Sequence, residues 1–212
     1  MEDFSRSIAS ILLQIEAVKI ELQKPFTWAS GWRSPIYCDN RKILSFPRER
    51  SIVTKAFASM VKERFPEAEY LAGVATGAIA HGVLVAQELN LPFVYVRSAP
   101  KAHGLTNLIE GKIEPGKKVV VIEDLISTGG SSLQAVEALR TAGMEVLGML
   151  AIFNYSFDVS QNRFQEANCP VYTLSNYHAL IDLALDEGRF ATSDLESLRA
   201  WRVAPDQWGL SL

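Results

Sequence analysis

The residues best suited to chemistry lie in Val119–Ser132, which reads VVVIEDLISTGGSS. Its apolar run lacks alternation and predicts a buried strand, which ends in two adjacent carboxylates, Glu123 and Asp124. The loop Ser127–Ser131 then brings hydroxyls and accessible backbone N–H groups to the start of a helix, an arrangement suited to a phosphate monoester. Because acids repel phosphate, we expect these two to face hydroxyls, a metal or a developing cation. A phosphorylated sugar satisfies both halves of the segment.

The surrounding sequence alternates apolar strand patterns with helical patterns, which predicts a parallel sheet with right-handed crossovers and helices on both faces. Ligands bind outside the carboxyl ends of the strands in such sheets, so we expect the chemistry just after residues 75, 97, 122 and 153. The predicted strands are Leu71–Ala75, Phe93–Arg97, Lys118–Ile122, Val146–Phe153 and Val171–Leu174, and the predicted helices between them are Ala78–Leu89 and Ser131–Ala142.

The two ends of the chain depart from this alternation. Apolar residues at helical spacing predict one amphipathic helix over residues 4–22. Residues 25–40 are irregular, and the C-terminal stretch predicts two short helices. We expect one domain, 1–212, with a core over about 46–175. Residues 1–45, together with the C-terminal helices, should form a small cap over the sheet.

Composition excludes several classes of protein. The chain has 212 residues, of which 48% are hydrophobic and 21% charged, as in ordinary globular proteins and unlike disordered or collagen-like chains. A net charge of −3 provides no basic field for nucleic acid, and no apolar run approaches the ~20 residues of a membrane span. The polar N-terminus argues against a secretory signal. Cys38 and Cys169 are expected to be reduced thiols, which favours a cytoplasmic protein, although a disulfide remains an alternative.

Val119–Ser132 resembles the diphosphoribosyl-binding motif of the type I phosphoribosyltransferases. The resemblance implies the fold of that family: a central, mainly parallel sheet flanked by helices, with a small hood from the N-terminal segment. Further segments resemble the branch of the family that acts on orotate. These are Phe26–Asn40, Gly73–Ala80 and Arg97–Gly104, the last running on to Ile109–Gly111.

The likeness covers roughly residues 4–205. It implies transfer of the 5-phosphoribosyl group from phosphoribosyl diphosphate to orotate, giving orotidine 5′-monophosphate and diphosphate in pyrimidine biosynthesis, with Mg²⁺ as cofactor. No direct protein ligand to the metal is expected: Mg²⁺ would be held by phosphoribosyl diphosphate, and Asp124 could contact it through water.

The segment from 97 to 111 carries Arg97, Lys101 and His103, followed by glycine and polar residues, and is typical of a mobile, cation-bearing lid. In the family, the neighbouring subunit supplies this loop, so the resemblance implies a homodimer that shares it across the interface. Lys101 and His103 match family positions that contact diphosphate. A transition state resembling an oxocarbenium ion requires cations on the leaving group and a carboxylate near the ribose. Lys101, His103 and Asp124 are therefore the expected catalytic residues.

The resemblance also assigns binding residues. Tyr37, Cys38 and Ser127 match positions that contact the base. Relatives use basic residues for orotate at two positions that read Ala29 and Tyr155 here, and Arg33 is a candidate substitute. The residues expected to bind phosphoribosyl diphosphate are Thr76, Gly77, Arg97, Lys101, His103, Glu123, Asp124, Leu125, Ile126, Ser127, Thr128, Gly129, Gly130 and Ser131.

Two alternatives remain. The first is a type I phosphoribosyltransferase for another base, against which Phe26–Asn40 argues. The second is a non-catalytic regulator that senses phosphoribosyl diphosphate and binds nucleic acid. Such a regulator needs a basic surface or an added winged-helix module, and the sequence indicates neither.

Overall fold

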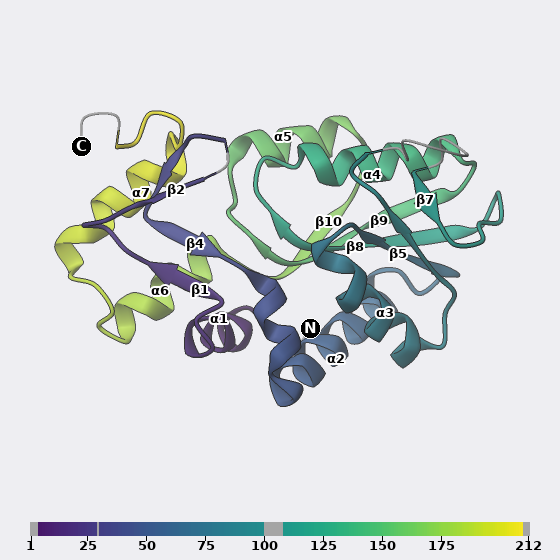
Figure 1. Ribbon diagram of the computed structural model, residues 1–212, viewed down its shortest axis with the longest axis horizontal. Coiled ribbons are helices and arrows are strands. Elements are labelled where there is room, and N and C mark those ends of the chain that lie inside the picture. The colour runs from purple at the N-terminus through teal and green to yellow at the C-terminus, as the bar shows by residue number, and fades with distance from the viewer. Residues whose placement is uncertain (1–3, 29, 100–107, 210–212) are drawn as a thin grey trace.

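The computed structural model describes residues 4–28, 30–99 and 108–209. A six-stranded sheet in the order β10-β9-β8-β5-β6-β7 forms the centre of the molecule (Figure 1). Neighbouring strands are parallel except at β7, which pairs antiparallel with β6, so the mainly parallel sheet is confirmed. The strands are β5 (Tyr70–Val74), β6 (Phe93–Val96), β7 (Ile109–Glu110), β8 (Lys118–Ile126), β9 (Glu145–Asn154) and β10 (Val171–Asn176).

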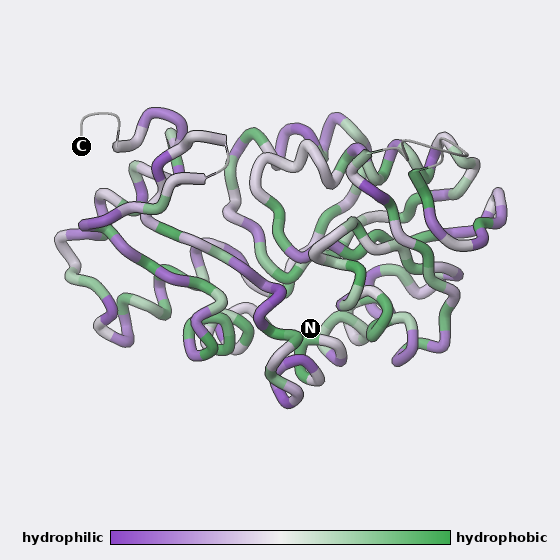
Figure 2. The backbone as a smooth tube through the Cα atoms, in the orientation of Figure 1, coloured by the Kyte–Doolittle hydropathy of each residue, from purple (hydrophilic) through white to green (hydrophobic). Residues whose placement is uncertain are grey.

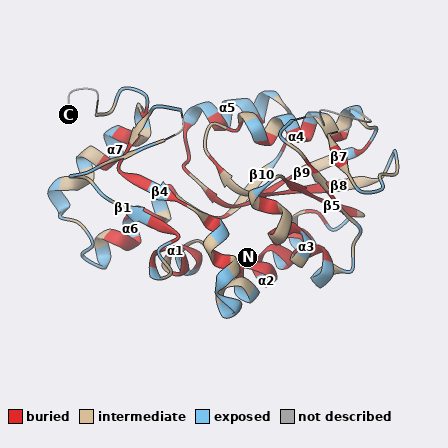
Figure 3. Ribbon diagram, viewed as in Figure 1, coloured by how far each residue is buried: buried red, intermediate tan, exposed pale blue. Residues whose placement is uncertain are grey.

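Helices cover both faces of this sheet. In Figure 1, α2 (Pro47–Arg64) and α3 (Gly77–Leu89) lie below it, and α4 (Gly130–Thr141) and α5 (Asp158–Glu166) lie above it. Alternate residues of β8 enter opposite cores: Val120 and Ile122 pack with α2 and α3, whereas Val119 and Val121 pack with α4. The strands are accordingly apolar and buried, and polar, exposed positions lie on the outer faces of the helices (Figures 2 and 3).

Strand β8 is longer than the sequence pattern predicts. It continues through both acids to Ile126, because the ten-residue strand β9 pairs with it as far as Ile126↔Asn154. The prediction that the strand ends at the two carboxylates was therefore wrong. Glu123 and Asp124 are strand residues, and successive side chains of a strand point to opposite faces.

The single helix predicted over residues 4–22 was also wrong. Helix α1 covers only Ser5–Gln14, and Glu16 has a left-handed φ of 54°. The chain then forms β1 (Val18–Ile20), which pairs antiparallel with β4 (Ile36–Cys38). A second small ladder joins β2 (Phe26–Thr27) to β3 (Arg33–Ser34).

The C-terminal segment returns to the same region of the molecule. It contains α6 (Tyr177–Asp186), the short 3₁₀ helix η2 (Thr192–Asp194) and α7 (Leu195–Val203), and α6 packs against α1. We use the name hood for residues 4–45, including the 3₁₀ helix η1 (Asn40–Ser45), together with α6 and α7; its strands and these helices lie together at the left of Figure 1. Across the described ranges, no helix combines the length and apolar character needed to cross a membrane.

Aromatic packing holds the hood together. Trp201 of α7 is completely buried, and its ring centroid lies 5.3–5.7 Å from those of Trp28, Tyr155, Phe157 and Tyr177. Its indole N–H donates to the Arg33 carbonyl at 3.2 Å, which ties α7 to the β2–β3 ladder. Rings of this size bury a large apolar area and contact one another favourably in tilted and edge-on geometries.

Candidate active site

The loop Ser127–Gly129 connects β8 to α4, and helix α5 supports it. Gly129 has a φ of +79°, and a Cβ at this position would lie 3.0 Å from the Phe164 ring, so both conformation and space favour glycine. The Arg163 guanidinium donates to the Thr128 carbonyl at 3.0 Å. Gly130 and Ser131 then begin a 12-residue helix. The N–H groups of a first helical turn attract anions, so this braced loop is a candidate phosphate site, and we refer to Ser127–Ser131 as the phosphate loop.

Asp124 lies against the turn between β5 and α3. A Cβ built on Gly77 would lie only 2.2 Å from Oδ2 of Asp124, so the carboxylate is seated directly over the backbone of the turn. Asp124 is partly exposed, and Thr76, which precedes Gly77 in the turn, is exposed. The structure therefore brings Asp124 to the Thr76–Gly77 turn, as expected for residues that the sequence assigned to one site from two separate segments.

Glu123 occupies a different environment from its neighbour. It is 4% exposed and accepts a hydrogen bond from the Ser132 hydroxyl at 2.8 Å, beneath the start of α4. Burial, and then the charge of Asp124, raises the pKa of Glu123 to about 8. Ile126 is also completely buried, so the side chains of Glu123 and Ile126 lie in the interior and not on the open side of the loop.

A cavity of about 250 Å³, which we call the base cavity, lies between the hood and the carboxyl end of β8. The structure brings Tyr37, Cys38 and Ser127 together in its wall, although these residues come from two segments 90 positions apart. Burial raises the pKa of the Cys38 thiol well above its usual range, which keeps the thiol neutral. The described residues that line the cavity carry no charge and are Thr27, Trp28, Tyr37, Cys38, Leu125, Ser127 and Tyr155.

Ser127 also lines a second cavity of about 430 Å³, together with Thr128 and the hood residues Trp28, Ser30 and Trp32. The hydroxyl-bearing start of the phosphate loop therefore contributes to the walls of two adjacent cavities. A ligand that joins a flat ring to a sugar phosphate fits this layout, because both of its parts would meet at Ser127.

Of the expected lid, residues 97–111, the structure describes only the two ends, 97–99 and 108–111. The Arg97 N–H donates to the Leu108 carbonyl at 2.8 Å, and Nη1 of Arg97 lies 3.6 Å from Oε1 of Glu110. Arg97 also lines a largely apolar cavity of about 570 Å³ beside α4, next to Ala75 and Ser131. Lys101 and His103, both expected at the diphosphate, lie outside the described residues.

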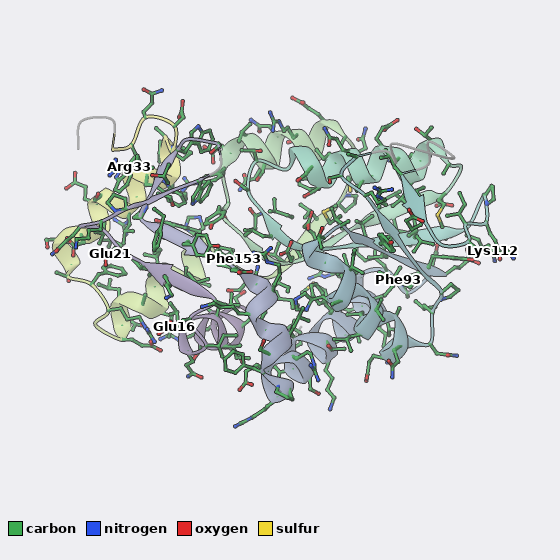
Figure 4. All side chains as sticks on the ribbon, viewed as in Figure 1. Glu16, Glu21, Arg33, Phe93, Lys112 and Phe153 are labelled. Carbon is green, nitrogen blue, oxygen red and sulfur yellow. The ribbon has the colours of Figure 1, made fainter. Side chains whose placement is uncertain are left out.

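Tyr155 occupies one of the two positions at which the resemblance to the family implies a basic residue. It is 2% exposed, and its ring stacks on that of Phe157 with the centroids 5.6 Å apart. Arg33, the candidate substitute, is not among the residues that line the base cavity and lies in the hood, at the upper left of Figure 4. Ala29 lies outside the described residues.

Two buried polar residues near the site received no ligand-binding role from the sequence. Asn40 is completely buried and donates from Nδ2 to the carbonyl of Asp124 at 2.6 Å. His81 of α3 is 1% exposed. Burial lowers the pKa of His81, while Asp124 and the Asn40 backbone oppose that effect. The available signal for Asn40 was its place at the end of the segment that resembles the base pocket.

A glycine-containing loop at a helix N-terminus, an acid beside it and a hood over the carboxyl edge of a parallel sheet fit a phosphoribosyltransferase. The sequence model for the phosphoribosyl transferase domain matches residues 40–187. The chain is 55% identical to the orotate phosphoribosyltransferase of Bacteroides fragilis over 98% of both chains. It is 52% identical to that of Bacillus subtilis over 94% of this chain and 92% of the relative. The chain belongs to the orotate phosphoribosyltransferase family.

Solved structures agree with this assignment. The orotate phosphoribosyltransferase of Aeropyrum pernix superimposes with a TM-score of 0.75 at 25% identity, covering 87% of this chain and 99% of the other. The UMP synthase of Leishmania donovani gives a TM-score of 0.77 at 26% identity, covering 93% of this chain and 42% of that longer protein. The type I phosphoribosyltransferase fold expected from the sequence is confirmed.

Proposed function

We propose that the protein is a pentosyltransferase that transfers the 5-phosphoribosyl group of phosphoribosyl diphosphate to orotate. The products are orotidine 5′-monophosphate and diphosphate, in the pathway to UMP. The observation that carries this proposal is the neutral, aromatic cavity that opens directly beside the phosphate loop and shares Ser127 with it. High identity to orotate phosphoribosyltransferases over nearly the whole chain supports the same assignment.

The geometry of the loop and the strand ends supports the following placement of the substrate. The 5-phosphate binds the N–H groups of Thr128–Ser131 at the N-terminus of α4. The ribose hydroxyls are placed against Asp124, because a carboxylate accepts hydrogen bonds and would repel the phosphates. The diphosphate extends toward the Thr76–Gly77 turn and the lid residues Lys101 and His103. The base enters the base cavity next to Tyr37 and Cys38.

The reaction breaks the bond between C1 of the ribose and the diphosphate oxygen and forms a bond from C1 to N1 of orotate. The diphosphate leaves with the electron pair of the broken bond, and the N1 proton of orotate passes to water. Positive charge develops on the ribose ring as the diphosphate leaves. Asp124 stabilises this charge electrostatically, and a lid that excludes water strengthens that interaction. Lys101 and His103 would stabilise the charge of the leaving group.

We further propose that Mg²⁺ is the cofactor and that phosphate oxygens hold it. Within the described ranges, no three His, Cys, Asp or Glu side chains lie close enough to bind a metal ion by themselves. Asp124, partly exposed beside the predicted diphosphate position, would contact the ion through water. Bound Mg²⁺ would neutralise charge on the leaving diphosphate.

The assembly and location of the protein are also proposals. We propose a homodimer in which the segment 97–111 of each subunit completes the site of its partner, with no nucleic-acid or membrane partner. Two free, buried cysteines, Cys38 and Cys169, support a cytoplasmic location, since thiols persist in reducing compartments.

A panel of bases tests the reaction. The protein is mixed with Mg²⁺ and phosphoribosyl diphosphate, and orotate, uracil, adenine, hypoxanthine or guanine is added separately. Loss of the near-ultraviolet absorbance of orotate reports orotidine 5′-monophosphate formation, and nucleotide products report the other bases. We expect turnover with orotate alone. Turnover with another base would retain the reaction and change the substrate, and binding of phosphoribosyl diphosphate without turnover would favour the regulator.

A further inference from the structure

Asn40 joins the wall of the base cavity to the strand that carries Asp124. Its Nδ2 donates to the main-chain carbonyl of Asp124 at 2.6 Å, and its Oδ1 accepts from the Cys38 thiol at 3.3 Å. Cys38 lines the base cavity, and Asp124 lies over the Gly77 turn. We propose that Asn40 is a positioning residue that holds Asp124 in register with the base pocket. This inference rests on the proposed function.

The position of Asn40 explains why β8 needs this contact. Strand β8 pairs with β5 only as far as Ile122, opposite Gly73, so the Asp124 carbonyl lies beyond the end of that ladder. Asn40, which is completely buried, supplies this carbonyl with a donor, and a carbonyl shielded from water without a partner is costly. Asn40 is the first residue of η1 and follows the hood strand β4 after one residue, so the donor comes from the last segment of the N-terminal part of the hood before α2 of the core.

The contacts of Asn40 leave its amide little freedom. The side chain is completely buried, donates one N–H and accepts at its oxygen, and reversing the amide would break both of these hydrogen bonds. Hydrogen bonds at both ends of a buried amide favour one arrangement of the groups that they join. The Asn40 side chain therefore links Cys38, in the wall of the base cavity, to the main chain at Asp124.

This arrangement places two reacting partners relative to each other. Orotate would sit against Cys38, and the ribose carbon that it attacks would sit against Asp124. A misplacement of about 1 Å between reacting groups can reduce a rate on the order of 100-fold. Since Asp124 acts most strongly on the charge of the transition state, loss of Asn40 should lower kcat more than it changes either KM.

The competing explanation is that Asn40 only stabilises the fold. A variant that removes a comparable hydrogen bond between hood and core, away from the site, distinguishes that role from the positioning of Asp124. Ser175 of β10 is also completely buried, and its hydroxyl donates to the Ser5 carbonyl at 2.8 Å, joining the core to α1 of the hood. Ser175 lines none of the cavities of the site. Ser175→Ala therefore removes a buried hood–core hydrogen bond without touching the site.

The experiment compares Asn40→Ala, Asn40→Asp and Ser175→Ala by steady-state kinetics with both substrates and by urea unfolding. Asn40→Asp keeps the volume and an acceptor oxygen but, as a carboxylate, has no N–H for Asp124. We expect kcat to fall by about 10- to 100-fold in both Asn40 variants and to stay within about twofold in Ser175→Ala. A folded Asn40 variant with unchanged kcat, or an equal loss in Ser175→Ala, would overturn the proposal, as would failure of both Asn40 variants to fold.

A double-mutant cycle identifies the route of the effect. If Asn40 acts through Asp124, Asn40→Ala should cost almost nothing further in an Asp124→Ala background, whereas general loosening of the hood would give additive losses. Additive losses would overturn the proposal. The wild-type protein separates this test from the proposed function: absence of orotate turnover in the wild type refutes the function, and normal wild-type turnover with unaffected Asn40 variants refutes only the role of Asn40.

Discussion

Gly77→Ala should disable Asp124 without unfolding the protein. A Cβ at this position would lie 2.2 Å from Oδ2, 2.4 Å from Cγ and 2.5 Å from Oδ1 of Asp124, whereas ordinary contact begins at 3.4 Å. The carboxylate must therefore move by roughly 1 Å. A displacement of that size at the reacting carbon costs on the order of 100-fold in rate, or about 2.7 kcal/mol of transition-state stabilisation.

The fold should tolerate this substitution. The three atoms that clash belong to the end of a flexible side chain. Gly77 is the first residue of α3, and alanine there reduces the conformational entropy of the unfolded chain, which stabilises proteins by about 0.4–1 kcal/mol at compatible sites. We expect an unchanged or slightly raised midpoint of urea unfolding together with the loss of activity.

Steady-state kinetics of orotate consumption, with urea unfolding of the same preparations, measures both effects. Asp124→Ala removes the clashing carboxylate, so Gly77→Ala should have little further effect on the rate in that background. A Gly77→Ala protein with kcat/KM within about twofold of wild type would refute the placement of Asp124 as the ribose acid. An undiminished effect in the Asp124→Ala background would show that the clash acts through another group.

Three further predictions concern the remaining residues of the site. Glu123 has an ordinary pKa of 4.5 and a folded-state pKa of about 8, so the folded protein holds one more proton between these values and its free energy of unfolding falls as the pH rises. Measured by urea unfolding, the free energy of unfolding of the wild type relative to Glu123→Gln should decline by at most about 1.4 kcal/mol per pH unit from pH 5 to 8. A difference between the two proteins that does not change with pH would contradict the burial of Glu123 as a protonated acid. Tyr155→Phe removes one hydroxyl and should raise the KM for orotate about tenfold, as expected for a lost hydrogen bond, with kcat retained; an unchanged KM would exclude that hydroxyl from base recognition. Lys101→Ala should lower kcat by orders of magnitude with an unchanged circular dichroism spectrum, and a normal rate would remove Lys101 from the leaving-group site.

The sheet was predictable because its central strands are buried on both faces. Such strands are nearly continuous apolar runs, as at Lys118–Ile122, and turns and helices separate them in the sequence. The hood was less predictable, since short strands carry little periodic signal. Val18 and Leu22 fit a helical repeat, but Val18 and Ile20 also fit the alternation of a strand. The segment forms a strand and not a helix because it pairs with Ile36–Cys38, a contact that lies outside the local sequence.

The sequence alone indicated the candidate phosphate loop and the adjacent acids, because each is a local pattern whose chemistry follows from a few neighbouring residues. The resemblance to the phosphoribosyltransferases, and not the chemistry of its residues, indicated the segment that lines the base cavity. Tertiary structure decided that the two acids occupy different environments: Glu123 is buried against Ser132, and Asp124 lies over Gly77. It also decided that Asn40 meets the Asp124 carbonyl, 84 positions along the chain. Such contacts depend on where the ends of strands meet in space, and no local pattern of residues encodes that distance.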